Sequence, residues 1–223
     1  MENEEIIIPK VEEVMQFASL AGAEFTQLNQ EQTDKIVESV FRAAYDNRIS
    51  LAKMATEETG IGKWEDKVIK NVVASLLVYE DIKDLKTVGI ISEDKKLGVV
   101  EIAQPMGPVL AIIPVTNPTS TTIFKILISL KSRNPVIICP SRNAIKSSSE
   151  AARICYEAAL EAGAPEYCIQ WLDKVTRDRT HALMSHKKLA LILATGGGGL
   201  VKSAYSSGTP TIGVGAGNVP VYI

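Results

Sequence analysis

Residues 107–139 read GPVLAIIPVTNPTSTTIFKILISLKSRNPVIIC, and their pattern decides the fold. An apolar strand at Val109–Ile113 leads through a proline-containing turn into a mostly apolar helix at Thr121–Lys131. A second apolar strand follows at Val136–Cys139. Short apolar strands joined by helices are typical of βαβ units, in which the strands run parallel and helices cover the sheet.

The same alternation continues towards the C-terminus. A long helix is expected at Ala144–Ala162, and Gly163 ends it. The further elements expected are a strand at Cys168–Leu172, a helix at Arg179–Met184, a strand at Leu189–Ala194, a helix at Leu200–Ser206 and strands at Pro210–Gly213 and Val219–Ile223. The sequence therefore predicts a Rossmann-like α/β fold, an open and mainly parallel sheet with helices on both faces.

The chain before residue 105 has a different texture. Apolar residues recur at helical spacing over Ile36–Ala55 and again over Val68–Leu77, with Gly60 and Gly62 between the two helices. Residues 88–91 and 97–103 read as the two strands of a hairpin around a charged turn. We expect one domain made of a helical arm (1–86), a hairpin (87–104) and a Rossmann-like core (105–223).

Composition excludes several classes of function. Of the 223 residues, 46% are hydrophobic, enough for one sizeable core, and the net charge of -2 leaves no basic excess for nucleic acid. No apolar run reaches about 18 residues, so no membrane span is expected, and the acidic N-terminus MENEEIII is not a secretory signal. An odd number of cysteines without CxxC spacing, and two isolated histidines, favour a reducing cytoplasm and no metal site.

Open parallel sheets bind ligands beyond the carboxyl ends of their strands, and three turns there carry suitable chemistry. The first is Pro114–Ser120, where Asn117 supplies an amide and Thr119 or Ser120 could cap the next helix. The residues alone leave open that this is only a rigid turn with a helix cap.

The second turn is Thr195–Gly199, between a strand and a helix. Its glycines allow a ligand to approach the backbone, and the helix start presents free N–H groups to a phosphate; the alternative is a flexible loop. The third turn, Gly213–Asn218, fails the dinucleotide fingerprint, because Asn218 replaces the third glycine and a strand follows. No phosphate-binding G-x-x-x-x-G-K-[ST] loop or G-x-S-x-G elbow is present.

Taken in order, these turns resemble the aldehyde dehydrogenase superfamily, and most closely the aldehyde dehydrogenase half of bifunctional aldehyde–alcohol dehydrogenases. The stretches that carry the resemblance are PVTNPTS (114–120) with IFK (123–125), LILATGGGG (191–199), AYSSGTPTIGVGAGN (204–218), VIKN (68–71) and SED (92–94). The similarity covers nearly the whole chain. It implies a CoA-acylating enzyme that oxidises acetaldehyde or a similar short aldehyde with NAD, or NADP, and CoA.

The resemblance also implies roles for single residues. Asn117 would donate to the substrate oxygen as it gains negative charge. The turn Pro114, Val115, Thr116, Asn117, Pro118 and Thr119 would line the nicotinamide end of the cofactor, bordered by Gly213 and Val214. Ser141 would lie at the adenosine end, and Thr195, Gly196 and Gly197 would approach the pyrophosphate. By the same resemblance we expect a homo-oligomer, with the hairpin as a candidate contact.

Two positions depart from the hydrolytic members of the superfamily. Cys139 stands where those enzymes have a lysine for the adenosine ribose, which leaves NAD and NADP both open. Val214 falls where they have the glutamate that activates water, and residues 212–223 contain no acidic residue. Because valine cannot act as a general base, we expect the thioester intermediate to pass to CoA rather than to water.

No cysteine of this chain matches the catalytic position of the superfamily. Cys139, Cys155 and Cys168 all fall in apolar segments, so we expect buried thiols. The nucleophile and the catalytic domain would lie beyond Ile223, and this chain alone would be an inactive, cofactor-binding fragment. The alternatives are a fragment of a hydrolytic aldehyde dehydrogenase, a glutamyl-phosphate-type reductase, and a non-catalytic nucleotide-binding or assembly module.

Overall fold

The computed structural model describes the backbone of residues 4–215, 217 and 221 and, within these ranges, the side chains from Lys10 onward. Its main sheet has the strand order β5-β4-β3-β6-β7, and every neighbouring pair runs parallel. The strands are β3 (Val109–Ile112), β4 (Val136–Cys139), β5 (Ile169–Trp171), β6 (Leu191–Thr195) and β7 (Thr211–Val214). The predicted Rossmann-like parallel sheet is confirmed.

The strand order creates a switch point beside β3. From β3 the chain builds outward through β4 to β5, then returns to the other side of β3 and builds β6 and β7. The connections therefore leave the carboxyl ends of β3 and β6 in opposite directions. In open α/β sheets this divergence opens a crevice in which ligands bind.

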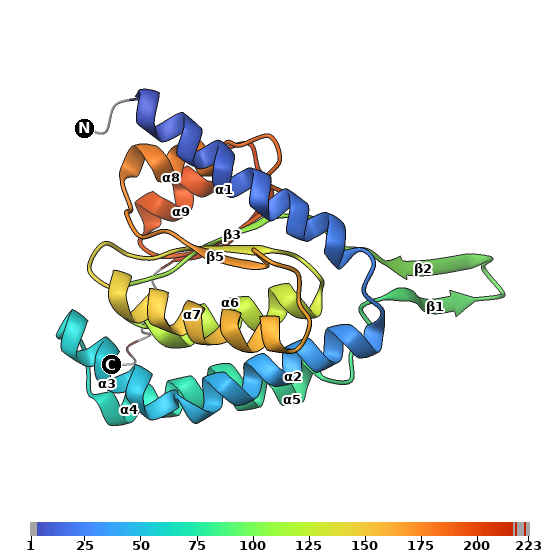
Figure 1. Ribbon diagram of the computed structural model, residues 1–223, viewed down its shortest axis with the longest axis horizontal. Helices are drawn as coiled ribbons and strands as arrows, with labels where there is room; N and C mark the ends of the chain where they lie inside the picture. The colour runs from blue at the N-terminus through green and yellow to red at the C-terminus, as the bar shows by residue number, and fades with distance from the viewer. Residues whose placement is uncertain (1–3, 216, 218–220, 222–223) are drawn as a thin grey trace.

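Helices cover both faces of the sheet (Figure 1). One face carries α6 (Pro118–Lys131) and α7 (Ile145–Glu161), and the other carries α8 (Arg177–Met184) and α9 (Gly198–Tyr205). The strands are buried on both sides, so Val109 and Ala111 join one apolar cluster while Leu110 joins the other. Covered faces explain why these strands read as continuous apolar runs rather than as alternating ones.

The predicted helical arm is not one unit. α1 (Glu4–Phe25) crosses the face with α8 and α9, where Val11, Met15 and Ala18 are buried (Figure 1). The other helices form a layer outside α6 and α7: α2 (Gln30–Asp46), α3 (Arg48–Thr59), α4 (Trp64–Val72), the π-helical turn η1 (Val73–Leu77) and α5 (Val78–Ile82). The sequence pattern showed amphipathic helices but not which face each one covers.

The continuous helix expected over Ile36–Ala55 is also wrong, because the chain breaks at Asn47. The Asn47 side chain donates from Nδ2 to the Ala43 carbonyl oxygen at 2.9 Å, which satisfies an acceptor at the end of α2. The break after α3 occurs where expected, at Gly60, whose φ of 65° is left-handed.

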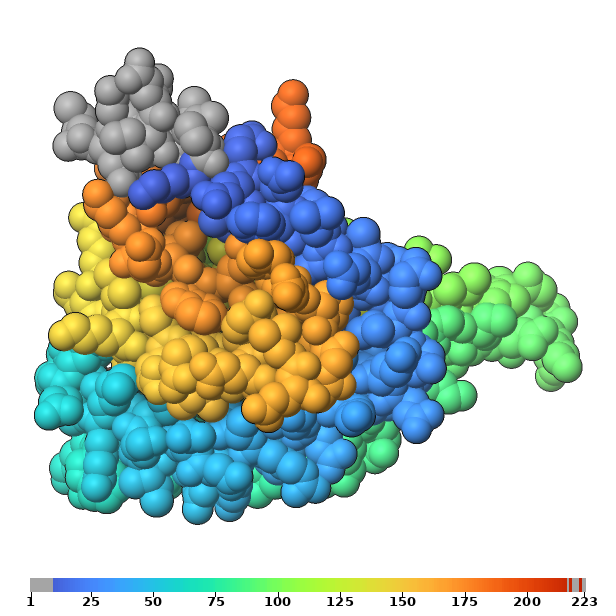
Figure 2. Space-filling view, in the orientation of Figure 1, coloured from blue at the N-terminus to red at the C-terminus, as the bar shows by residue number. Residues whose placement is uncertain are grey.

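The hairpin is confirmed as an antiparallel pair of β1 (Gly89–Asp94) and β2 (Val99–Ala103). Asp94 closes its turn by accepting from the backbone N–H groups of Lys96 and Leu97 at 2.8 and 3.0 Å. The hairpin projects from the body with both faces exposed (Figures 1 and 2). None of its strand residues is buried within the described chain.

The start of α6 differs from the predicted one, and this difference matters for the site. α6 begins at Pro118, so Thr119 and Ser120 lie inside its first turn, and the prediction that one of them caps the helix is wrong. The N-cap residue is Asn117, which makes no side-chain capping bond.

The strand predicted at 219–223 falls outside the described residues except for Val221. Among the described helices, none combines the length and apolar character that a membrane crossing requires.

Candidate functional site

A cavity of about 480 Å³ opens beyond the carboxyl ends of the central strands. Segments that follow β3, β4 and β6 all contribute to its wall, as expected for a switch-point crevice. The predicted residues that line it are Pro114, Val115, Thr116, Ser141, Thr195, Gly196 and Gly197. Three turns that lie far apart in the sequence thus meet at one hollow.

Two helices that begin near this cavity have fewer donors to offer at their starts. α6 starts with Pro118, which has no N–H. At the start of α7 the backbone N–H groups of Lys146 and Ser147 donate to the carboxylate of Glu58 at 2.8 and 2.7 Å. Glu58 comes from α3 and neutralises this helix end. The start of α7 is therefore not free for a ligand.

The start of α9 is different. Gly197 is its N-cap residue, and the N–H groups of Gly198 and Gly199 have no acceptor within the helix. A Cβ atom added at any of these three glycines would meet no atom within 4 Å. Packing inside the chain therefore does not require glycine here, and the open space leaves room for a ligand. Free N–H groups at a helix start bind anionic groups such as phosphate.

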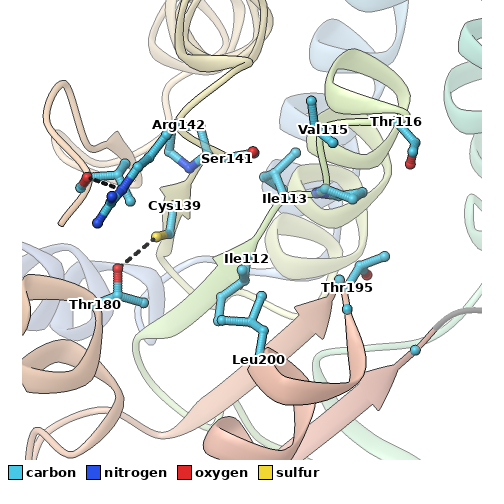
Figure 3. A pocket seen from close by; sticks show the side chains of 16 residues that line it. Ile112, Ile113, Val115, Thr116, Cys139, Ser141, Arg142, Thr180, Thr195 and Leu200 are labelled. Atoms are coloured by element: carbon cyan, nitrogen blue, oxygen red, sulfur yellow. Dashed lines mark hydrogen bonds between the residues drawn. The ribbon is translucent and has the colours of Figure 1, made fainter. Parts of the chain in front are cut away.

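Polar and cationic groups lie on the β4 side of the cavity (Figure 3). Cys139 and Thr180 point toward each other from β4 and α8, with Sγ and Oγ1 3.7 Å apart. Arg142 donates from Nε to the Val175 carbonyl oxygen at 3.1 Å, which holds the guanidinium at the rim. These four residues all line the cavity.

None of the three thiols is a nucleophile in this environment. Burial raises the pKa of the Cys139 thiol to about 11 and those of the Cys155 and Cys168 thiols to about 12. All three cysteines are buried and free. Because the thiolate is the reactive form, these cysteines are inert near neutral pH.

Lys125 places a buried amine beneath the switch point. Its Nζ donates to the carbonyl oxygens of Ile112 in β3 and Leu193 in β6, both at 2.7 Å. Burial lowers the pKa of this amine to about 7, opposed by the nearby Cys139. The side chain is 3% exposed and joins the two strands whose ends form the crevice.

A second hollow of about 470 Å³ shares Thr195 with the first. Asn117 lies here rather than in the first cavity, together with Val214 and the exposed ring of Phe124. The remaining lining residues are Lys70, Val73, Ala74, Val78, Ser120 and Thr121. Among the described residues, no carboxylate or imidazole lines this second hollow.

The structure separates the other predicted site residues. Pro118 and Thr119 are buried in the first turn of α6 and line neither hollow. Gly213 lies in β7, where a Cβ atom would come within 2.7 Å of Tyr205 Cε2 and 2.8 Å of Val201 Cγ1. The absence of a side chain at this position is thus explained by the packing of α9 on β7.

Sequence reasoning missed several residues of the site. Arg142, Val175, Thr180 and Leu200 line the first cavity, but their positions depend on how α8 and α9 pack, which no local pattern encodes. A signal existed for Lys125, a single charge inside the apolar run 123–130.

Comparison with known proteins assigns the family. The aldehyde dehydrogenase family model matches residues 8–212. The bifunctional aldehyde-alcohol dehydrogenase AdhE of Escherichia coli K12 is 53% identical over 203 residues, which cover 91% of this chain and 23% of that protein. The solved acetylating aldehyde dehydrogenase of Geobacillus thermoglucosidasius is 51% identical with a TM-score of 0.94, and the match covers 96% of this chain and 47% of that one.

A more distant solved structure has the same fold. It is an engineered glycolyl-CoA reductase with bound NADP+, 31% identical with a TM-score of 0.82, and it is matched over 93% of this chain and 47% of its own. This chain thus spans about half the length of the solved enzymes and about a quarter of the bifunctional one. The resemblance drawn from the strand-end turns is confirmed, and the chain belongs to the aldehyde dehydrogenase family.

Proposed function

We propose that this chain is the NAD-binding part of a CoA-acylating aldehyde dehydrogenase, which oxidises acetaldehyde or a similar short aldehyde to acyl-CoA. The observation that carries the proposal is the switch-point cavity, whose wall includes Gly196 and Gly197 beside the free N–H groups of α9. The match covers 47% of the acetylating relative's chain, and the complete reaction is proposed for the enzyme as a whole.

The residues of the cavity fit a dinucleotide. The pyrophosphate would bind the N–H groups at Gly197–Gly199, where a helix start favours negative charge and no side chain is in the way. The adenosine would lie towards Ser141 and Arg142, and the nicotinamide towards Pro114–Thr116. When bound, the dinucleotide supplies the acceptor for the hydride that leaves the substrate carbon.

NAD is the proposed cofactor, and NADP fits as a second choice. A smaller hollow shares Arg142 and Thr180 with the cavity and also includes Arg177 and His181. Guanidinium groups bind phosphate well, so this hollow suits a phosphate on the adenosine ribose, as in NADP or CoA.

The second hollow suits the aldehyde. Its walls are mainly apolar, with Val73 and Phe124 among them, and Asn117 supplies an amide. An N–H donor placed at the carbonyl oxygen would stabilise the negative charge that develops when a nucleophile adds to the carbonyl carbon. We therefore keep Asn117 as the oxyanion donor of the proposed reaction.

The proposed reaction uses a cysteine from outside this chain. Its thiolate adds to the aldehyde, the hydride departs to the dinucleotide, and the resulting thioester is transferred to the thiol of CoA. Transfer to CoA rather than to water is favoured because Val214 and the rest of the second hollow offer no carboxylate to activate water. The same observation argues against the hydrolytic alternative.

The hairpin supports a proposal of self-association. Ile90 and Ile102 pair across its strands and are 62% and 56% exposed, with Leu97 at the tip 76% exposed. An apolar, unpaired two-stranded sheet is marginal in water and is stabilised when another chain covers it. A homo-oligomer in which the hairpin contacts a second copy fits these exposures, and it leaves cofactor binding intact.

A calorimetric titration of residues 1–223 with NAD, NADP, ADP-ribose and acetaldehyde tests the cofactor proposal. We expect one saturable site for NAD, competed by ADP-ribose because the pyrophosphate is the shared anchor. Acetaldehyde alone should give no competition. Absence of binding at millimolar NAD and NADP, by a chain whose folding is verified by circular dichroism, would contradict the proposal.

A further inference from the structure

The turn between β3 and α6 is held from outside by α4. Lys67 donates from Nζ to the Thr116 carbonyl oxygen at 2.7 Å, and Lys70 donates from Nζ to Asn117 Oδ1 at 2.9 Å. Asn71 accepts from Thr119 Oγ1 at 2.9 Å. One short stretch of α4 thus contacts Thr116 and Asn117, which lead into α6, and Thr119 in its first turn.

The contact from Lys70 fixes the orientation of the Asn117 amide. An ammonium group only donates hydrogen bonds, so the amide must present its oxygen to Lys70. The Nδ2 end then faces away from Lys70, and its nearest partner is Thr116 Oγ1 at 3.5 Å, a long and weak contact. The donor end of Asn117 is therefore left available in the hollow that both residues line.

We propose that Lys70 is a positioning residue, which turns the side-chain amide of Asn117 so that its N–H groups face the carbonyl oxygen of the aldehyde. This inference rests on the proposed function of Asn117 as oxyanion donor. A charged donor on the amide oxygen also polarises the amide, which strengthens the N–H groups as donors.

Lys67 shows by contrast what a purely structural lysine looks like in this helix. Lys67 is 5% exposed and bonds to main chain, whereas Lys70 is exposed and bonds to a side chain that lines the same hollow. Burial lowers the pKa of Lys67, and the charge of Lys70 lowers it further. Both lysines hold the same turn, but only Lys70 contacts a group with a proposed role in the chemistry.

The kinetic test uses the full-length enzyme that contains this chain. Asn117→Ala should lower kcat about 100-fold through loss of the oxyanion donor. Lys70→Met should lower kcat about tenfold with little change in KM for the aldehyde, because an unfixed amide still reaches the oxygen part of the time. Lys70→Arg keeps a donor and should restore most of the activity. Lys63→Met, an exposed lysine beside the same helix, is the matched control and should behave as wild type.

The double variant separates a positioning role from general damage. If Lys70 acts through Asn117, Lys70→Met should reduce kcat no further in the Asn117→Ala background. Additive losses, or wild-type activity of Lys70→Met while Asn117→Ala is impaired, would overturn the role of Lys70 alone. An unimpaired Asn117→Ala variant would instead remove the oxyanion proposal on which it depends.

A spectroscopic readout needs no activity. In 15N-labelled residues 1–223, Lys70→Met should shift the side-chain Nδ2 resonances of Asn117, and Lys70→Arg should leave them close to wild type. The backbone resonances of the sheet should be unchanged in both. Unshifted Asn117 side-chain resonances in Lys70→Met would show that the contact does not hold the amide and would refute the inference.

Discussion

Gly197 and Gly213 carry no side chain for different reasons. At Gly197 the backbone has φ -66° and ψ 156°, which alanine adopts readily, and the space where a Cβ would lie is empty. At Gly213 the same space is filled by Tyr205 and Val201. The proposed ligand accounts for the first glycine, and packing accounts for the second.

These reasons predict opposite phenotypes for alanine. Gly197→Ala should leave the free energy of unfolding unchanged or raise it by about 0.5 kcal/mol, yet weaken NAD binding at least roughly tenfold, about 1.4 kcal/mol, by filling ligand space. Gly213→Ala should lower the free energy of unfolding by about 1–3 kcal/mol through overpacking. Urea denaturation and calorimetric titration measure the two quantities. NAD affinity unchanged in Gly197→Ala would count against a pyrophosphate at this helix start.

Because burial lowers the pKa of Lys125, we expect the free energy of unfolding to depend on pH. Its pKa is about 7 in the folded chain and 10.5 ordinarily, so between these values the unfolded chain binds a proton that the folded chain does not. Stability from this group therefore rises with pH across that window, by up to about 1.4 kcal/mol per pH unit. Below pH 7 both states are protonated, and the cost of the buried charge is present in full.

Lys125→Met removes this contribution. Between pH 7.5 and 9.0 the wild-type chain should gain roughly 2 kcal/mol in free energy of unfolding relative to the variant. Urea denaturation at the two pH values measures the difference, with Lys63→Met as a control for loss of an exposed lysine. Parallel pH profiles for wild type and Lys125→Met would show that Lys125 does not titrate in this range.

At the scale of elements, the sequence located the strands better than the helices. β4 was predicted with the bounds that it has, because a strand covered on both faces is a continuous apolar run between turn residues. The break at Asn47 was missed because the apolar spacing on either side of it continues the same helical period. Which face of the sheet α1 covers was also unpredictable, since amphipathicity shows that a face is buried but not against what.

The residues of the site were likewise only partly predictable from the sequence. The turns after β3 and β6 were identifiable because proline, asparagine and glycine have positional meaning after a strand. The contacts of Lys70 and Lys67 with residues 116 and 117 join segments that lie nearly fifty residues apart, and only the tertiary structure brings them together. The resemblance supplied a role for Asn117, whereas the hollow that it faces came from the packing of α4 and α6.

The exposed hairpin leads to a prediction about self-association of the chain. If β1 and β2 contact a second copy, Ile102→Lys should shift the chain towards monomer without loss of folding, because Ile102 is exposed and pairs only within the hairpin. Sedimentation velocity measures the shift. Leu20→Lys replaces a similarly exposed residue on α1 and should leave the assembly intact. A monomeric wild-type chain, or equal effects of both substitutions, would contradict the assignment.

At the scale of the whole molecule, two hollows lie beside Thr195, at the end of β6. One is the proposed dinucleotide site, and the other contains Asn117 among mostly apolar walls; both include Thr195. A cofactor and an aldehyde bound in this way would meet near the end of β6, where a hydride passes from one to the other. In the proposed reaction, the nucleophile approaches the second hollow from another part of the enzyme.

This requirement predicts that residues 1–223 alone have no dehydrogenase activity. The thiols of Cys139, Cys155 and Cys168 are buried and their pKa values lie at about 11 to 12, so none forms a thiolate near neutral pH. No reduction of NAD should occur when acetaldehyde and CoA are added, as measured by the absorbance of the reduced cofactor. Turnover that disappears when one of the three cysteines is replaced by alanine would disprove this.

The most direct test of a dinucleotide at the switch point is amide chemical-shift mapping of residues 1–223 during titration with NAD. The N–H groups of Gly197, Gly198 and Gly199 should show the largest shifts and should move again with ADP-ribose, because both ligands carry the pyrophosphate. Shifts that saturate but centre on another surface, with the glycine amides unmoved, would contradict the proposed site.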